Sequence, residues 1–254
     1  MAKVLLGFMG VGKSSVAPYL NGRFVDMDQV IEDKIGMSIT DFFAKEGEAS
    51  FRQIESETLE ELLQEGDDVI ISTGGGVVVT ECYNTCFVLQ EDQQYFMVDG
   101  GGGSTILHQL KHAGINWKDI KTIFVTHKHI DHITGIIWML RMICQHMRQG
   151  EYEGEATVYA HEELIELLKN LAVKLLQKKD VTFIGKRLHL IPVADDESVS
   201  ILSKKVTFFD IQSTKAKQFG FCMELGNGEK LTCCGDEPYN PCEKQFAENS
   251  TWLL

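Results

Sequence analysis

Three histidines and an aspartate stand within six consecutive residues, as His127, His129, Asp131 and His132. Imidazole and carboxylate ligands suit zinc, and also manganese or iron. On a loop that leaves a strand, His127 and His129 alternate onto one metal, while Asp131 and His132 turn toward a second. Two metals about 3.5–4 Å apart can share a hydroxide nucleophile and clamp a phosphodiester or ester oxygen. The alternative is a polar loop with coincidental histidines.

A second pattern lies near the N-terminus, where residues 7–14 read GFMGVGKS and fit the motif GxxxxGK[ST]. Glycines let backbone N–H groups turn inward around phosphates, helped by the N-terminus of the following helix. Lys13 would reach the β- and γ-phosphates, and the Ser14 hydroxyl would hold Mg²⁺. The alternative is a glycine-rich turn that only links a strand to a helix.

The elements around these motifs change in character near residue 80. In the first part, strands at 3–9, 24–27 and 68–72 alternate with helices at 30–35, 38–45 and 48–64. This alternation predicts a parallel α/β sheet.

In the second part, the histidine motif follows a strand at 122–126 and precedes a helix at 132–148. Further helices are expected at 105–113 and 162–176. We expect the other strands at 86–90, 94–98, 156–160, 181–184, 188–193, 206–211, 220–225 and 230–234. This half should be mostly sheet, with helices on the outside.

The first part resembles shikimate kinase in its phosphate loop, in Asp26-Met27-Asp28 after the next strand, in Phe51-Arg52-Gln53-Ile54-Glu55, and in Thr73-Gly74-Gly75-Gly76. The resemblance implies that Ser14 holds Mg²⁺ and that Asp28, Arg52 and Gly75 bind shikimate. It implies ATP binding by Gly10, Val11, Gly12, Lys13, Ser14 and Ser15. Taken alone, Asp28 can equally be a solvated strand end, and Arg52 can pair with a glutamate on its own helix.

The second part resembles the metallo-β-lactamase superfamily, whose signature HxHxDH matches residues 127–132. Asp99, in a strand and glycine turn typical of that family, is expected to orient the metal loop from outside the ligand shell. Cys234-Gly235-Asp236 resembles the strand end that supplies a bridging aspartate, although Asp236 can also be an ordinary turn residue. The resemblance implies two zinc sites held by His127, His129, Asp131, His132 and Asp236, with Asp131 and His132 catalytic. It is nearest to the phosphodiesterase branch that includes ribonuclease Z.

Both resemblances are incomplete. The kinase pattern stops near Glu81, before the arginine-bearing lid and the second substrate arginine, so kinase turnover is doubtful and ATP binding is the safer expectation. In the second part Gln212 stands where the family has a metal-binding histidine. No histidine follows His189, although the family's last metal ligand should lie beyond Asp236. We therefore expect weakened metal binding and reduced hydrolysis.

Composition and net charge limit the classes of partner that we expect the chain to bind. The chain has 254 residues and a net charge of −13, of which residues 1–81 carry −9 (6 Lys+Arg against 15 Asp+Glu). This charge disfavours nucleic acid, although the resemblance leaves transfer RNA open. The seven cysteines form no CxxC pair, and there is neither a signal peptide nor an apolar run long enough to cross a membrane, so we expect a cytoplasmic protein with reduced thiols. The remaining histidines, including His108 and His161, are read as surface or hydrogen-bonded residues. A homodimer remains open.

The sequence predicts an α/β protein in two modules. Residues 1–81 form a partial P-loop parallel α/β sheet, and residues 82–254 a partial αββα metallo-β-lactamase fold. The leading hypothesis is a metal-dependent hydrolase that attacks a phosphodiester or ester with a metal-bound hydroxide and carries an ATP-binding module. The alternatives are phosphorylation of shikimate by the first module and a non-catalytic relic that binds nucleotide and metal.

Overall fold

The computed structural model describes residues 3–5, 21–66, 68–73, 86–226, 228–237 and 240–254. The chain divides into two compact units. Residues 1–82 and 225–254 form the first unit, and residues 83–224 form the second. None of the helices described is long and apolar enough to cross a membrane.

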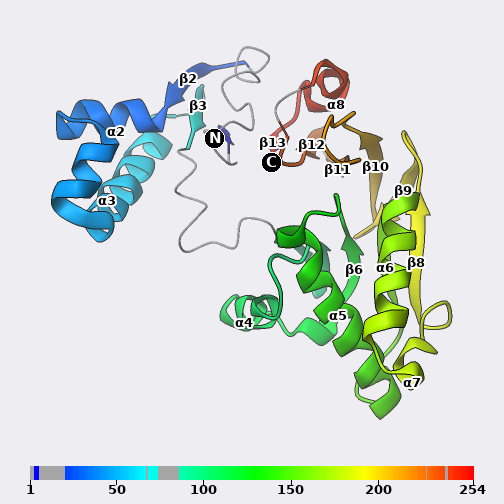
Figure 1. The fold of residues 1–254 in the computed structure, drawn as a ribbon. Helices are drawn as coiled ribbons and strands as arrows, with labels where there is room; N and C mark the ends of the chain where they lie inside the picture. The colour runs from blue at the N-terminus through cyan, green and yellow to red at the C-terminus, as the bar shows by residue number, and fades with distance from the viewer. Residues whose placement is uncertain (1–2, 6–20, 67, 74–85, 227, 238–239) are drawn as a thin grey trace. The chain divides into compact units, whose positions relative to one another are not determined.

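The first unit contains a parallel sheet with strand order β1-β3-β2. Figure 1 shows α2 and α3 in blue and cyan beside this sheet. The elements are β1 (Lys3–Leu5), β2 (Arg23–Asp26), α2 (Met27–Ile35), α3 (Ile39–Gln64) and β3 (Val69–Ser72). The two helices pack on β2 and β3 through a small apolar core that includes Met27, Ile31, Phe51 and Ile71.

Local signals explain where these helices begin and end. Asp26 caps α2 by accepting a hydrogen bond from the backbone N–H of Asp28, and Gly36 ends the helix in the left-handed conformation. Ser38 caps α3 in the same way. Gly47, with φ 80° and ψ 172°, interrupts α3 between the two helices that the sequence predicts there.

The C-terminal part of the first unit contains β12 (Glu229–Cys233), the 3₁₀ turn η4 (Pro241–Glu243), α8 (Lys244–Ala247) and β13 (Trp252–Leu253). Strands β12 and β13 pair in parallel. Ala247 and Leu253 form a second small apolar cluster with Ile70 of β3. This segment therefore covers one side of the strand that the sequence assigns to the kinase-like module.

The second unit contains a five-stranded sheet in the order β4-β5-β6-β7-β8. Strands β4 and β5 are antiparallel, and the remaining neighbours are parallel. The strands are β4 (Phe87–Glu91), β5 (Gln94–Val98), β6 (Ile120–Phe124), β7 (Ala156–His161) and β8 (Leu188–Val193). The helical elements are α4 (Thr105–His112), the 3₁₀ turn η3 (Trp117–Asp119), α5 (Ile130–Gln149), α6 (Glu162–Leu175) and α7 (Lys178–Val181).

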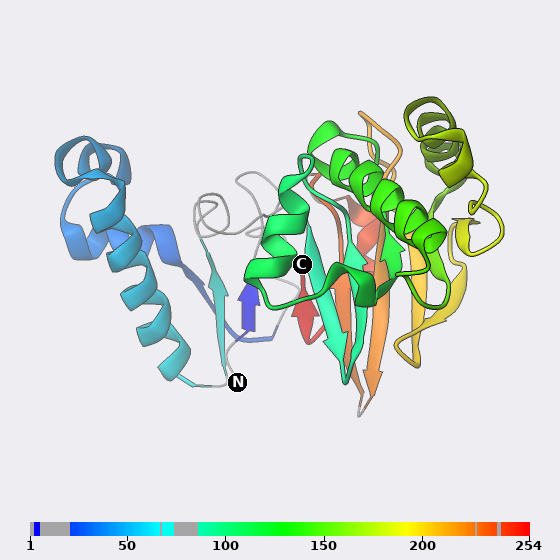
Figure 2. The ribbon, with the colours of Figure 1, turned by 90° about the horizontal axis from the view of Figure 1, so that it is seen from below.

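The helices and a second group of strands cover opposite faces of this sheet. The apolar stripe of α5, with Ile136, Leu140 and Ile143, joins a large core with α4, α6 and the strands. Figure 2 shows this helical layer, in green to yellow-green, against the strands. On the other face lie β9 (Ser198–Ile201), β10 (Lys204–Asp210) and β11 (Phe219–Gly226), which pair antiparallel.

Aromatic side chains fill the space between the strands of the two layers. The ring centroids of Phe124 and Phe208 lie 4.8 Å apart, and those of Phe96 and Phe221 lie 5.5 Å apart. Such pairs add to the burial of their large apolar surfaces. The second unit thus has the layer order helix, sheet, sheet, as the sequence predicts for this part of an αββα fold.

Two differences between the predicted and the observed elements lie in the second unit. The strand predicted at 181–184 is wrong, because the one-turn helix α7 ends at Val181 and Ile184 forms only an isolated bridge to Leu188. Its apolar residues are needed as core side chains and not as a ladder. The sequence analysis also missed β9, whose hairpin turn uses Leu202 and Ser203 at φ 52° and 58° in place of the usual asparagine and glycine.

Candidate metal centre

The histidine loop, residues 126–132, leaves the end of β6 and enters α5. Its start is fixed by backbone hydrogen bonds to two neighbouring strands. The N–H of Val125 donates to the carbonyl of Tyr159 in β7, and the carbonyl of Thr126 accepts from Phe219 in β11. The loop therefore begins at the carboxyl end of a buried sheet, where α/β proteins place their ligand sites.

Hydrogen bonds select the ring nitrogen that His127 offers. The Thr126 hydroxyl donates to Asp99 Oδ2 at 2.7 Å, so it accepts from Nδ1 of His127, 2.9 Å away. This arrangement leaves the lone pair on Nε2 of His127, which lies 2.7 Å from Nδ1 of His129. His127 and His129 thus turn one potential ligand nitrogen each toward the same point.

His132 is oriented in the same manner. Its Nδ1 lies 2.8 Å from Asp99 Oδ2, so the buried carboxylate accepts that proton and leaves Nε2 as the ligand atom. Nε2 of His132 lies 3.7 Å from Oδ2 of Asp131, whose side chain is half-exposed. The His127 and His132 rings are 4.1 Å apart between centroids. Two donor pairs therefore sit side by side, and imidazole with carboxylate is a donor set that suits a divalent metal ion.

Asp99 is the anchor of the loop, as the sequence predicts. Besides binding His132 and the Thr126 hydroxyl, it accepts the backbone N–H of Thr126 at 2.8 Å. Asp99 is 4% exposed, and a φ of 58° places it in the left-handed region. A buried charge in a strained backbone is tolerated because three donors stabilise it.

A close backbone approach holds α5 against the turn that carries Asp99. The N–H of Gly100 donates to the carbonyl of His132, and the N–H of Gly135 donates to the carbonyl of Gly101. A Cβ on Gly135 would lie 1.7 Å from the Gly100 carbonyl oxygen, and one on Gly100 would lie 2.4 Å from the backbone nitrogen of Ile136. Glycine is therefore required at both positions to keep the histidines in place.

The remaining predicted site residues are distributed differently. Asp236 follows β12 and belongs to the first unit, so its place in a metal site stays a prediction. Gln212 lies between β10 and β11, is exposed and has a φ of 56°.

In the kinase-like part, Asp28 lies in the first turn of α2, and the backbone of Arg52 lies within α3. Gly75 lies outside the described residues. So do the residues predicted to bind ATP and Mg²⁺, which are Gly10, Val11, Gly12, Lys13, Ser14 and Ser15. Their roles remain predictions.

His161 lies deeper than a surface histidine. It ends β7 and is only 3% exposed. The surface half of the interpretation is therefore wrong, whereas a hydrogen bond with the Lys217 backbone agrees with the hydrogen-bonded half. The place of His161 one residue before a helix, at the end of an apolar strand next to the histidine loop, is the signal that could have found it.

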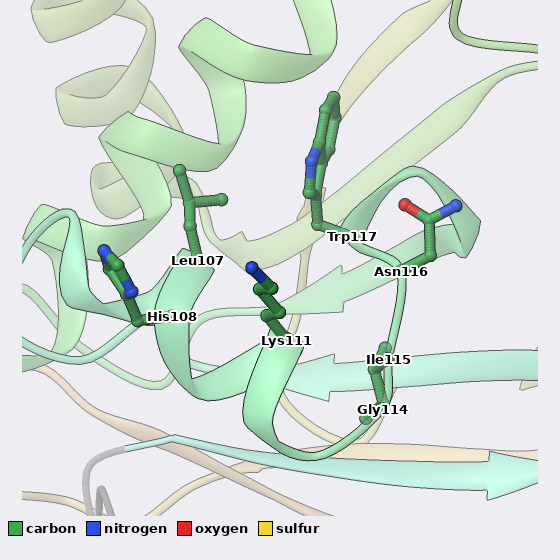
Figure 3. A pocket seen from close by; sticks show the side chains of 7 residues that line it. All are labelled: Leu107, His108, Lys111, Gly114, Ile115, Asn116 and Trp117. Carbon is green, nitrogen blue, oxygen red and sulfur yellow. The ribbon is translucent and has the colours of Figure 1, made fainter.

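A pocket of about 550 Å³ lies elsewhere in the second unit, around the end of α4 and the turn that follows it. Figure 3 shows Leu107, His108, Lys111 and Trp117 standing around it, and Gly114, Ile115 and Asn116 on the turn. These seven lining residues include none of the predicted metal ligands. The pocket is therefore not part of the candidate metal centre.

The layer order and the site define a protein of the metallo-β-lactamase fold. The structure matches the metallo-beta-lactamase fold protein YhfI from Bacillus subtilis with a TM-score of 0.52 and 20% identity, over 65% of this chain and 61% of that one. Human tRNase Z, short form, matches with a TM-score of 0.43 and 19% identity, over 59% of this chain and 60% of that one. The assignment to the ribonuclease Z branch stays a prediction.

The chain belongs to the family described as anti-Pycsar protein Apyc1, whose model matches residues 69–253. The HxHxDH motif identifies the superfamily but not this family.

The N-terminal part is similar to shikimate kinase. The shikimate kinase family model matches residues 9–96. Shikimate kinase of Streptococcus gordonii is 60% identical over 63 residues, 25% of this chain and 39% of that protein. That of Streptococcus suis is 57% identical over 72 residues, 28% of this chain and 44% of that protein. The chain thus spans about two fifths of the length of the curated relatives that it matches.

Proposed function

We propose that the second unit is a metal-dependent hydrolase of a phosphodiester or an ester. The observation that carries the proposal is the pair of donor sets, His127 Nε2 with His129 Nδ1 and His132 Nε2 with Asp131 Oδ2. Each set faces one point, and hydrogen bonds on the far side of two of the rings fix the ligand nitrogen. Structural polar clusters have no need of that double selection.

In this proposal His127 and His129 would hold one ion and His132 and Asp131 another, and Asp236 stays the fifth predicted ligand. When bound, such ions supply Lewis acidity and a hydroxide nucleophile at neutral pH. The chain's own part is to keep the lone pairs of His127 and His132 aimed at the ions and to hold the loop still. Asp99 does both, because its carboxylate accepts hydrogen bonds from the Thr126 N–H, from the Thr126 hydroxyl and from Nδ1 of His132.

Metal content tests this function. We expect zinc, manganese or iron to be found by mass spectrometry in protein purified without added metal, at up to about two ions per chain. Asp131→Ala should lower that content and abolish cleavage of bis(p-nitrophenyl) phosphate. Asp119→Ala, on the exposed turn η3, is the matched control and should change neither. Equal metal content in wild type and Asp131→Ala, or unchanged cleavage, would overturn the proposal.

We propose, as a second function, that the first unit binds ATP and Mg²⁺ through Lys13 and Ser14. The identity of 57–60% to shikimate kinases over this segment favours it. Shikimate binding by Asp28, Arg52 and Gly75 follows from the same match. A fluorescent ATP analogue should bind to wild type and at least about tenfold more weakly to Lys13→Ala. If nucleotide and metal bind but neither shikimate phosphorylation nor phosphodiester cleavage is observed, the alternative of a non-catalytic relic that binds nucleotide and metal remains.

Three finer assignments also stay proposals. One is the division into modules at residues 81 and 82, and another is a cytoplasmic location with reduced thiols. The third is the partner set of a small phosphodiester or ester, without a membrane.

A further inference from the structure

The pocket at the end of α4 has a volume of about 550 Å³ and lies within the second unit, without any of the predicted metal ligands. Three of its lining residues belong to α4, and four belong to the turn and to η3 that follow. Cavities of about 300–1,000 Å³ are the size at which proteins bind small molecules. Figure 3 shows Leu107 and Lys111 on one side of the pocket and Trp117 on the other.

The polar side chains that line the pocket all carry N–H donors, and no carboxylate is among the seven lining residues. Lys111 brings an ammonium group, and the indole of Trp117 is a donor only. The side-chain oxygen of Asn116 accepts the backbone N–H of Lys118, so the NH₂ group of Asn116 is the part left for a ligand. In a chain with a net charge of −13, a pocket lined in this way favours an anion.

Lys111 and His108 lie on the exposed face of α4, one turn apart. In the described part of the chain neither side chain has an ion pair or a hydrogen bond. A lysine in the last turn of a helix can serve to complement the terminal carbonyls. Three of these carbonyls already accept backbone N–H groups of the turn, in the pairs Gln109–Ala113, Leu110–Ile115 and Lys111–Gly114. The ammonium of Lys111 is therefore available to a ligand.

The apolar lining of the pocket is formed in advance. Leu107, Ile115 and Trp117 are half-buried and pack against the large core of the second unit. Trp117 is held by two further rings, since its centroid lies 4.8 Å from that of His146 and 6.3 Å from that of Tyr152. A ligand with an apolar body therefore gains contact without the cost of ordering these side chains.

We propose that this pocket binds a small organic anion in which one carboxylate is joined to an apolar body such as an aromatic ring. The carboxylate pairs with Lys111 and accepts N–H groups of His108 and Asn116, while the body covers the apolar lining. A single carboxylate fits better than a phosphate monoester, because Lys111 alone among the seven lining residues is charged throughout the neutral pH range. The site goes beyond the proposed hydrolase function, since none of its residues takes part in that function.

The probe is 2-naphthoate, added to the full-length ¹⁵N-labelled protein as purified. The chain has three tryptophans, so ¹H–¹⁵N spectra contain three indole signals, and loss of one in Trp117→Phe assigns Trp117. We expect a saturable shift of the Trp117 signal. The signals of Trp138 and Trp252 should stay in place, and because both rings are partly exposed, at 37% and 43%, they report non-specific adsorption. Acetate, which lacks the apolar body, should cause no saturable shift at the same concentration.

Substitutions test the charge of the pocket. Lys111→Met should weaken the binding of 2-naphthoate about three- to fivefold, which is what one exposed ion pair contributes. It should leave the binding of the uncharged naphthalene-2-methanol unchanged. Asn116→Asp keeps the oxygen that accepts the Lys118 N–H but adds a negative charge, so it should also weaken 2-naphthoate. Lys169→Met removes an exposed charge from α6 and is the matched control, which should bind as wild type does.

The proposal is overturned if the Trp117 signal does not move, or if the Trp138 and Trp252 signals move with the same midpoint. Equal binding of 2-naphthoate by wild type and Lys111→Met also overturns it. Tighter binding of 2-naphthyl phosphate than of 2-naphthoate would overturn the assignment to a carboxylate. None of these outcomes depends on metal content or on cleavage of bis(p-nitrophenyl) phosphate, so failure of this site is distinguishable from failure of the hydrolase.

Discussion

The histidine loop and the segment similar to shikimate kinase carry the two strongest sequence signals in the chain, yet they depend on their surroundings in different ways. The loop's residues are contiguous, and Asp99, Gly100 and Phe219 of its own unit fix it. The kinase segment has 60% identity to its relative but corresponds to 39% of that protein's length. High sequence identity over a short segment therefore does not mean that the segment contains a complete site.

The buried apolar cluster beneath the histidine loop is also larger than the one in the kinase-like segment. Among the described residues, 24 buried side chains form the cluster beneath the histidine loop and its helices, against eight in the cluster beneath α2 and α3. Buried apolar area is the main source of stability. We therefore expect the metal centre to tolerate the loss of a single peripheral contact better than the kinase segment does, but to fail if the loop itself is displaced.

Gly135→Ala is the sharpest way to displace the loop. In an ordinary helix this change is favourable by up to about 1 kcal/mol. Here the new methyl group would meet the Gly100 carbonyl oxygen at 1.7 Å, so the turn and α5 must separate. We expect a loss of at least about 3 kcal/mol in the free energy of unfolding, measured with urea, together with loss of bound metal.

Gly114→Ala provides the control for Gly135→Ala. Gly114 has a φ of 71° with nothing within 4 Å of an added Cβ, so its loss should cost only about 1 kcal/mol through the backbone. Equal effects of the two substitutions would show that the close approach of Gly100 and Gly135 does not constrain the loop.

Asp99→Asn tests how far the charge of Asp99 holds the histidine loop in place. The variant keeps the size of the side chain but loses the charge that holds the Thr126 N–H, the Thr126 hydroxyl and His132 Nδ1. We expect the affinity for zinc to fall about 10–100-fold, as is usual when the partner of a ligating histidine is changed. Competition with a chromophoric chelator measures this affinity, and Asp92→Asn, on the exposed turn before β5, should leave it unchanged.

Much of this arrangement could be predicted from the sequence, because its signals are local. HxHxDH after an apolar strand identifies the loop, and Gly47, Gly36 and Ser38 mark the helix ends. The β9 hairpin was missed because Leu202 and Ser203 adopt positive φ values without the residues that usually signal them. Strand 181–184 was predicted wrongly because apolar residues that fill a core look the same as a short buried strand.

The burial of His161 could not be predicted for a different reason. Its burial depends on Lys217 and Phe219, which are more than 50 residues away in the chain. No spacing in the sequence reports such a contact. The grouping of residues 225–254 with the N-terminal segment is of the same kind, since it arises from Ile70 meeting Ala247 and Leu253.

Glu243→Gln probes this C-terminal segment and carries the smallest expected effect. Glu243 is 2% exposed, and burial raises the pKa of its carboxyl to about 7, against hydrogen bonds from Asn240 and Cys234 that lower it. Between pH 4.5 and 7 the unfolded chain releases this proton while the folded chain retains it. The unfolded state then binds fewer protons, so the free energy of unfolding of wild type falls as the pH rises from 5 to 8.

Glutamine keeps the shape of the neutral carboxyl and cannot ionise, so the variant should lose this part of the pH dependence. We expect it to match wild type at pH 5 and to be more stable by about 1–2 kcal/mol at pH 8. Fluorescence of Trp252, in a background with Trp117→Phe and Trp138→Phe, follows the unfolding of the first unit. Glu248→Gln, an exposed change in the same segment, should keep the wild-type profile. A Glu243→Gln profile parallel to wild type would mean that Glu243 ionises freely and that this segment packs more loosely than the core under the histidine loop.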